Sequence, residues 1–206
     1  MTEREFWRVI GTARRGSARR GSVADLNRQL GTPESALRVR GLERLLEERE
    51  VREVLAFHRT LAAVHRRAYR WDLWTAFGIA LGGVDRWQFR DAVSWLLLRG
   101  RRAYRRALAE PDVLARWDVD DAEIASAGAV TTVAHRVLDP ADTRNLAATI
   151  GGIDPPDRPW GYLTEADFPL LRRRFPRLTA RHLPGGSCRF DGALFHERPF
   201  AWKAWR

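Results

Sequence analysis

The sequence predicts a mainly α protein, a single compact multi-helix domain around a central αα-hairpin at about residues 72–99, with a short C-terminal β-hairpin. Three observations support this class. Residues 68–101 contain two helix-length apolar segments, each followed by glycine. Elsewhere, apolar residues recur at the spacing of helices with one buried face. An apolar fraction of 45% with 10% aromatics is sufficient for a proper core.

The first helix of the predicted hairpin lies at 73–81, a segment that is apolar almost all round and is therefore expected to be buried on several sides. Asp72 is placed to cap its start, and Gly82 to end it in the left-handed conformation. Trp71 and Trp74 flank this start, so we expect both rings to serve the core.

The second helix of the hairpin is predicted to begin at Asp85, because Gln88 three residues later completes a capping-box pattern. Gly100 is expected to close the unit. The buried positions follow helical spacing and are Phe89, Ala92, Val93 and Leu96.

Four helices and one loop are predicted before the hairpin. A first helix starts with the capping-box pair Thr2 and Glu5, and a flexible basic loop at 14–22 follows it. A short helix is expected from Ser22 to Leu30. The next helix takes Thr32 as its N-cap with Pro33 in its first turn, and a longer helix spans about 51–67. The expected buried faces are Phe6, Val9, Ile10 and Ala13, then Leu37, Leu42 and Leu45, then Val54, Phe57, Leu61, Val64 and Ala68.

After the hairpin, residues 101–109 are predicted to form a basic helix with Tyr104 and Leu108 inward. Its exposed side would carry Arg101, Arg102, Arg105 and Arg106. Pro111 and Asp112 restart a short helix. Asp120 and Glu123 repeat the capping-box pattern at the start of a helix that is predicted to end at Leu138. The small residues of this helix would let another helix approach closely. Those small residues are Ala125, Gly128, Ala129 and Thr132.

The C-terminal part differs in composition, which suggests a division into a helical domain at 1–152 and a remainder at 153–206. Within the first part, a helix from Asp139-Pro140 to Gly151 is expected. The remainder is expected to hold a proline-rich linker, a final helix over 164–175 and the β-hairpin, which turns at Asp191-Gly192. The aromatic tail carries Phe200, Trp202 and Trp205, so it is expected to fold back onto the helices or onto a second subunit as a homodimer.

The charge suggests an acidic partner. With a net charge of +10, the surface attracts anions, either an acidic protein or a nucleic acid. Lys203 is the only lysine, and this dominance of arginine also fits the codon bias of a GC-rich genome. Codon bias does not explain the surplus of basic over acidic residues, so a binding surface and a merely solvated basic surface both remain open.

Several classes of protein are disfavoured. No apolar run is long enough to span a bilayer, the polar N-terminus is no secretory signal, and a single cysteine excludes an internal disulfide framework, so a cytoplasmic protein is the simplest expectation. No Walker loop, dinucleotide-binding fingerprint or Gly-x-Ser-x-Gly elbow is present. We therefore expect no cofactor, and Cys188 is interpreted as incidental.

His58 and His65 lie beside the apolar stripe of the helix at 51–67 and are candidate binding residues. Seven residues along one helix separate them by about 10.5 Å, whereas paired histidine ligands on a helix normally sit four apart. Satisfied or half-exposed histidines are therefore the better interpretation, and no metal site is expected. His135 has no partner that the sequence predicts.

One set of residues resembles a known family. The set comprises Phe6-Trp7, Ala68-Tyr69, Trp71-Asp72-Leu73-Trp74, Gly82-Gly83, Phe89, Trp95-Leu96, Gly100-Arg101, Ala107-Leu108, Pro111-Asp112 and Leu114-Ala115. Over about residues 1–150 the chain is similar to the bacterial family named domain of unknown function 4240. The resemblance implies a compact helical domain and no settled activity.

The chain departs from that family at the turn between the two central helices. Family members usually read Asn-Gly-Gly-Cys-Ser-Asp-Asp-Gly-Phe there, whereas this chain has the segment 81–89, Leu-Gly-Gly-Val-Asp-Arg-Trp-Gln-Phe. The polar cluster is thus replaced by apolar and basic residues, which indicates a divergent member. Our candidate binding residues are Asp72, Trp74, Asp85, Arg86, Arg90, Arg101, His58 and His65.

Three functions follow as hypotheses. The first is a non-catalytic binding or accessory protein whose basic surface meets an acidic partner. The second is a pathway-specific enzyme whose site the sequence does not reveal, and a cleft gathering Asp72, Trp74, Asp85 and Arg101 would favour it. The third is sequence-independent nucleic-acid binding through the arginine clusters at 99–106 and 172–181.

Overall fold

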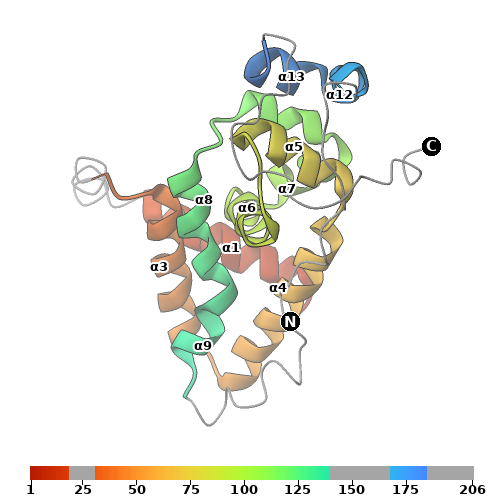
Figure 1. The fold of residues 1–206 in the computed structure, drawn as a ribbon. Helices are drawn as coiled ribbons and strands as arrows, with labels where there is room; N and C mark the ends of the chain where they lie inside the picture. The colour runs from red at the N-terminus through yellow and green to blue at the C-terminus, as the bar shows by residue number, and fades with distance from the viewer. Residues whose placement is uncertain (19–30, 140–167, 185–206) are drawn as a thin grey trace.

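The computed structural model describes residues 1–18, 31–139 and 168–184, and this part of the chain is helical without any strand (Figure 1). The mainly α class is therefore confirmed. The predicted β-hairpin, the helices expected at 22–30 and after Asp139, and the aromatic tail lie outside the described residues.

The described helices follow one another along the chain with short connections. The α-helices are α1 (Glu3–Ala18), α3 (Glu34–Glu47), α4 (Val51–Ala68), α5 (Trp71–Leu81), α6 (Arg86–Leu98), α7 (Arg101–Ala109), α8 (Asp121–Ala127), α9 (Val133–Val137), α12 (Phe168–Arg174) and α13 (Pro176–His182). Two 3₁₀ helices, η1 (Pro111–Arg116) and η2 (Gly128–Thr132), interrupt them.

Helix α6 occupies the centre of the molecule, where Figure 1 shows it almost end-on. It contacts α1, α3, α4, α5, α7, α8 and η2. The seven consecutive residues Ala92–Leu98 are all buried, so this half of the helix has no solvent-facing side. The predicted hairpin of α5 and α6 is confirmed, but α5 packs mostly against η1 and α13, and α6 alone is the central element.

The two helices of the hairpin meet through aromatic rings. Trp74 is 3% exposed, stacks on Phe89 at 4.4 Å between ring centroids, and donates its indole N–H to the Val84 carbonyl at 3.2 Å. Phe77 lies edge-on to Phe89 and to Trp95. Trp74 therefore serves the core as predicted, whereas Trp71 is only half-buried.

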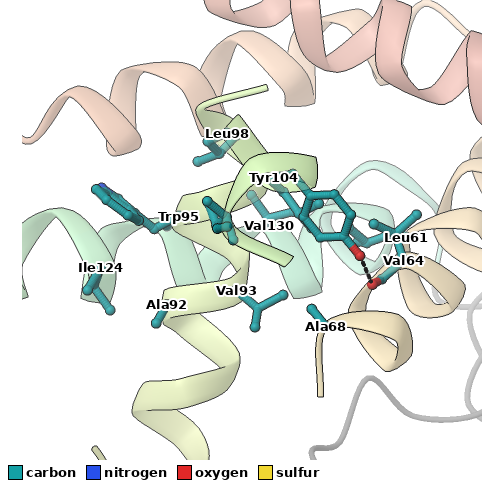
Figure 2. Packing of buried hydrophobic residues seen from close by; sticks show 14 of the residues in the cluster. Leu61, Val64, Ala68, Ala92, Val93, Trp95, Leu98, Tyr104, Ile124 and Val130 are labelled. Carbon is teal, nitrogen blue, oxygen red and sulfur yellow. Dashed lines mark hydrogen bonds between the residues drawn. The ribbon is translucent and has the colours of Figure 1, made fainter. Parts of the chain in front are cut away.

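Other helices close around α6 from several sides (Figure 2). Tyr104 of α7 is buried, and its hydroxyl donates to the Val64 carbonyl of α4 at 2.7 Å. Ile124 of α8 and Val130 of η2 belong to the same apolar cluster as Trp95. This cluster joins residues distant in the sequence into one core.

Two predicted helix ends are wrong. Helix α1 continues to Ala18, so residues 14–18 are helical although a loop was predicted there, and Ala13 packs closely on Gly41 of α3. A Cβ at Gly41 would lie 3.3 Å from the Ala13 carbonyl oxygen. Helix α3 begins at Glu34 without a Thr32 cap. Its buried face is also rotated from the expected one and consists of Ser35, Val39, Leu42 and Leu46, with Leu37 and Leu45 half-buried.

Two acidic side chains cap helices that are distant in the sequence. Asp120 accepts from the Glu123 amide at 2.9 Å as predicted, but Glu123 does not reach back to it. The Glu123 carboxylate instead accepts from the amides of Glu34 and Ser35 at 2.6 and 2.9 Å and caps α3. Asp112 of η1 likewise accepts from the first amides of α13, those of Arg177 and Leu178, at 3.1 and 2.9 Å.

The segment from Asp121 to Val137 is helical as predicted, but its middle turn is the 3₁₀ helix η2. The expected close approach at its small residues is confirmed at Gly128, where any Cβ would collide with the Asp91 carboxylate of α6. The predicted final helix is described from Phe168 as α12, and α13 follows it after a break at Phe175. Both belong to a layer at the top of Figure 1 in which α13 covers η1 and α5.

We predict that Trp74→Ala lowers the free energy of unfolding by about 3–5 kcal/mol, because it leaves a cavity beside Phe89 and removes the hydrogen bond to Val84. The measurement is urea-induced unfolding followed by circular dichroism. Trp87→Ala is the matched control, since that ring is 45% exposed and should cost far less. Equal losses of stability in the two variants would contradict the core role of Trp74.

Candidate functional site

The turn between α5 and α6 is built by two glycines and one aspartate. Gly82 and Gly83 have φ values of 70° and 122°, a region that favours glycine. Asp85 then caps α6, accepting from the amides of Trp87 and Gln88 at 2.7 and 2.8 Å, while the Gln88 side chain accepts from the Asp85 amide at 3.0 Å. The predicted capping box is confirmed.

Trp87, which sequence reasoning did not select, is the most exposed aromatic ring among the described residues, at 45%. The guanidinium groups of Arg86 and Arg90 lie 4.6 and 5.1 Å from its ring centroid, within cation–π range. Arg90 also pairs with Asp91 at 2.9 Å. The two arginines are therefore balanced by Asp85 and Asp91, and the turn is an aromatic surface with little net charge.

Burial raises the pKa of the Asp91 carboxyl, an effect that the neighbouring Arg90 opposes. The ion pair with Arg90 thus holds a partly buried carboxylate at the point where η2 packs on α6. This arrangement is explained by packing and needs no ligand.

Beneath the turn, His65 of α4 is fully buried and has a partner at each ring nitrogen. Its Nδ1 lies 3.3 Å from the Tyr69 hydroxyl and its Nε2 3.3 Å from the Ser94 hydroxyl, which donates to the Arg90 carbonyl at 3.2 Å. Burial, with a smaller contribution from Arg90, lowers the pKa of His65 to about 3. His65 is the satisfied histidine that the sequence predicts.

His58, two turns earlier on the same face of α4, differs from that prediction. Its side chain is 4% exposed, and Nδ1 is buried without a hydrogen-bond partner among the described residues. Its ring lies against His135 of α9, with centroids 5.9 Å apart and planes at 83°. Burial and the nearby His135 lower the pKa of His58 to about 4. His58 is therefore neither satisfied nor half-exposed.

The remaining candidates do not form an open site with the turn, and Trp74 alone among them contacts it, through the hydrogen bond to Val84. Asp72 pairs with Arg70 at 2.9 Å and accepts from the Leu73 amide at 2.9 Å, but the residue at the N-cap of α5 is Arg70. Trp74 is covered by the core, so it cannot line an open cleft. Arg101 begins α7, beyond the opposite end of α6 from the turn. The structure thus brings Asp85, Arg86 and Arg90 together at the turn, with Trp74 and His65 buried nearby.

Helix α7 presents a continuous basic face, as expected. Tyr104 is buried as predicted and four arginines are exposed, but the second buried residue is Ala107, and Leu108 is only half-buried. No carboxylate of the described residues lies within ion-pair distance of Arg101, Arg102, Arg105 or Arg106.

The second cluster, at 172–181, is partly neutralised. Arg177 pairs with Glu110 at 2.7 Å, and Arg181 lies 3.5 Å from Asp118. The α7 face is therefore the stronger of the two predicted anion-binding clusters.

Two hollows in the described part of the surface have linings without a recognisable catalytic group. One, of about 430 Å³, lies between α1 and α4 and is lined partly by ion-paired Arg49 and Glu53. Another, of about 310 Å³, lies between α12 and α13. Within the described ranges, no cluster of three or more metal-ligating side chains occurs, and no helix is long and apolar enough to cross a membrane.

These features define a mainly helical protein built around one buried helix, with a basic helix on its surface. The chain belongs to the family described as "Protein of unknown function (DUF4240)", whose model matches residues 1–139. The resemblance seen in the sequence is thereby confirmed. No curated protein and no solved structure gives a match.

We predict that Asp85→Asn retains the stability of the protein, whereas Asp85→Ala lowers it by about 1 kcal/mol, because asparagine can still accept the amides that begin α6. Urea unfolding of both variants measures the difference. A destabilisation of the asparagine variant as large as that of the alanine variant would show that the carboxylate charge itself is required.

We predict that acid destabilises the fold through its buried histidines. The pKa of His65 is 6.5 in the unfolded chain and about 3 when folded, so the unfolded state binds the proton first. The free energy of unfolding should therefore be highest above pH 6.5 and fall as the pH drops towards 3, by at most about 1.4 kcal/mol per pH unit for each such histidine.

Urea unfolding between about pH 7.5 and 5 measures the slope of the free energy of unfolding against pH. Most carboxyl groups have pKa values below this range and contribute little to the slope. His65→Gln removes the titration and should flatten the slope, although its stability at neutral pH is expected to be lower. His182→Gln is the control, because that ring is only half-buried and should contribute less. An unchanged slope in His65→Gln would contradict the prediction.

Proposed function

We propose that the protein is a non-catalytic binding or accessory protein that uses the exposed arginine face of α7 to bind an acidic partner. The observation that supports this function is the combination of Arg101, Arg102, Arg105 and Arg106 on one short helix, with no carboxylate of the described residues within ion-pair distance. Glu3 is the one described carboxylate whose pKa a cation of this face, Arg101, helps to lower. Four exposed like charges within one nine-residue helix repel one another, and an anionic partner relieves that repulsion.

The arginine face is held rigidly, which favours recognition over a merely solvated surface. Tyr104 anchors α7 to α4 through the hydrogen bond to the Val64 carbonyl, and Ala107 is fully buried. A preorganised guanidinium array loses less conformational entropy on binding than side chains on a loop. The protein is expected to act in the cytoplasm, since its single cysteine provides no internal disulfide.

The alternative that the chain is an enzyme has less support. The one pairing among the described residues that resembles a catalytic arrangement, His65 with Ser94, is 0% exposed at both residues, so a substrate cannot reach it. Sequence-independent nucleic-acid binding is a special case of the proposed function, because arginine contacts to phosphates carry no sequence information. The choice of probes below separates it from binding of an acidic protein.

We predict that replacing the four α7 arginines by glutamine weakens binding of a polyglutamate peptide at least about tenfold at low salt, because each removed charge weakens the electrostatic attraction. Titration followed by fluorescence anisotropy over about 50–300 mM salt measures this, with a DNA duplex of about 20 base pairs as the second probe. If DNA binds, the slope of log K against log salt should become shallower by about 0.9 for each phosphate that the variant no longer neutralises.

The matched control removes the same number of charges elsewhere, with Arg4, Arg40, Arg44 and Arg59 replaced by glutamine on α1, α3 and α4. This variant should keep most of the affinity. Equal weakening in both variants would mean that net charge alone attracts the probes and would overturn the α7 site. Binding of DNA without polyglutamate would assign the face to nucleic acid.

A further inference from the structure

His58 lacks the hydrogen bonds that a buried imidazole normally has. Its side chain is only 4% exposed, yet its Nδ1 has no partner among the described residues. An unsatisfied buried polar atom destabilises the folded state, so its presence calls for an explanation. His65 on the same helix shows the contrast, because both of its nitrogens are satisfied.

The nearest chemical partner of His58 is a second imidazole. His135 comes from α9, which packs beside α4 at the lower end of the molecule in Figure 1. His135 is exposed, so a small ligand can reach the pair from solvent. The sequence distance between the two residues explains why no helical spacing could indicate this pairing.

The separation of the rings fits a shared metal ion. A zinc-bound imidazole places its ring centroid about 3.2 Å from the metal, since the Zn–N bond is about 2.0–2.1 Å. Two such rings around one ion lie about 5.2–6.4 Å apart for N–Zn–N angles from tetrahedral to linear. The centroid distance of 5.9 Å lies inside that range. We propose that His58 and His135 together bind one divalent ion of the zinc, copper or nickel group.

The donor set selects this group of ions. Neutral imidazole suits zinc, copper and nickel, whereas calcium and magnesium prefer oxygen ligands. Ligation needs the neutral form of the imidazole and therefore weakens as the pH falls. No third protein ligand completes a cluster within the described ranges, so water fills the remaining positions and the ion exchanges readily. The bound ion links α4 to α9.

Isothermal titration of the full chain with zinc chloride and with nickel sulfate, at about pH 7.5, tests this site. The expected result is saturable binding of one ion per chain, weakened at least tenfold by His135→Ala. His135 is exposed, so this variant should fold normally. His58→Phe should also weaken binding at least tenfold. Because phenylalanine fills the space without a ring nitrogen, the melting temperature of this variant without metal should not fall.

His182→Ala is the matched control, because His182 also has a buried and unsatisfied ring nitrogen but no second histidine against its ring among the described residues. It should retain full binding. The melting temperature should rise with metal in the wild type and in His182→Ala, and should not change in His135→Ala. Absence of saturable binding, or equal weakening in His182→Ala and His135→Ala, would overturn the proposal.

Discussion

The burial of the C-terminal half of α6 on all sides is the constraint on which the rest of the structure depends. A helix whose residues 92–98 have no solvent-facing position needs apolar neighbours in every direction, and α1, α3, α4, α5, α7, α8 and η2 supply them. The same burial fixes the two ends of α6. At one end Asp85 caps the helix, and at the other Arg14 and Arg38 donate to the carbonyls of Arg99 and Leu98. Cations at a helix C-terminus are favourable for the helix dipole.

Carboxylates that act across the fold join the outer helices to this centre. Glu123 caps α3, and Asp112 caps α13, so each places an acceptor at amides that no local residue satisfies. The Asp112 contact holds the C-terminal helices against η1, beyond the segment that the family model matches. These bonds explain how short helices such as α13 remain ordered although their own length provides little stability.

The polar residues of the core fall into two kinds. His65, Ser94 and Tyr104 are fully engaged in hydrogen bonds and need no function beyond the fold. His58 is the second kind, because its Nδ1 is buried without such a partner among the described residues. On the surface, the α7 arginines have no carboxylate of the described residues within ion-pair distance. Our functional proposals therefore rest on the histidine that lacks a hydrogen-bond partner and on the arginines that lack a close ion pair among the described residues.

The sequence by itself determined the local features of the protein: the apolar periodicity of α4, the capping box of Asp85, the left-handed Gly82 and the inward face of α6. Each depends on residues within a few positions of one another. Only the tertiary structure decided three other features. Residues 14–18 extend α1 where a loop was predicted, the Glu123 carboxylate caps α3, and the His58 ring packs against His135. Those outcomes depend on which helices pack together, and local propensity does not encode contacts between distant segments.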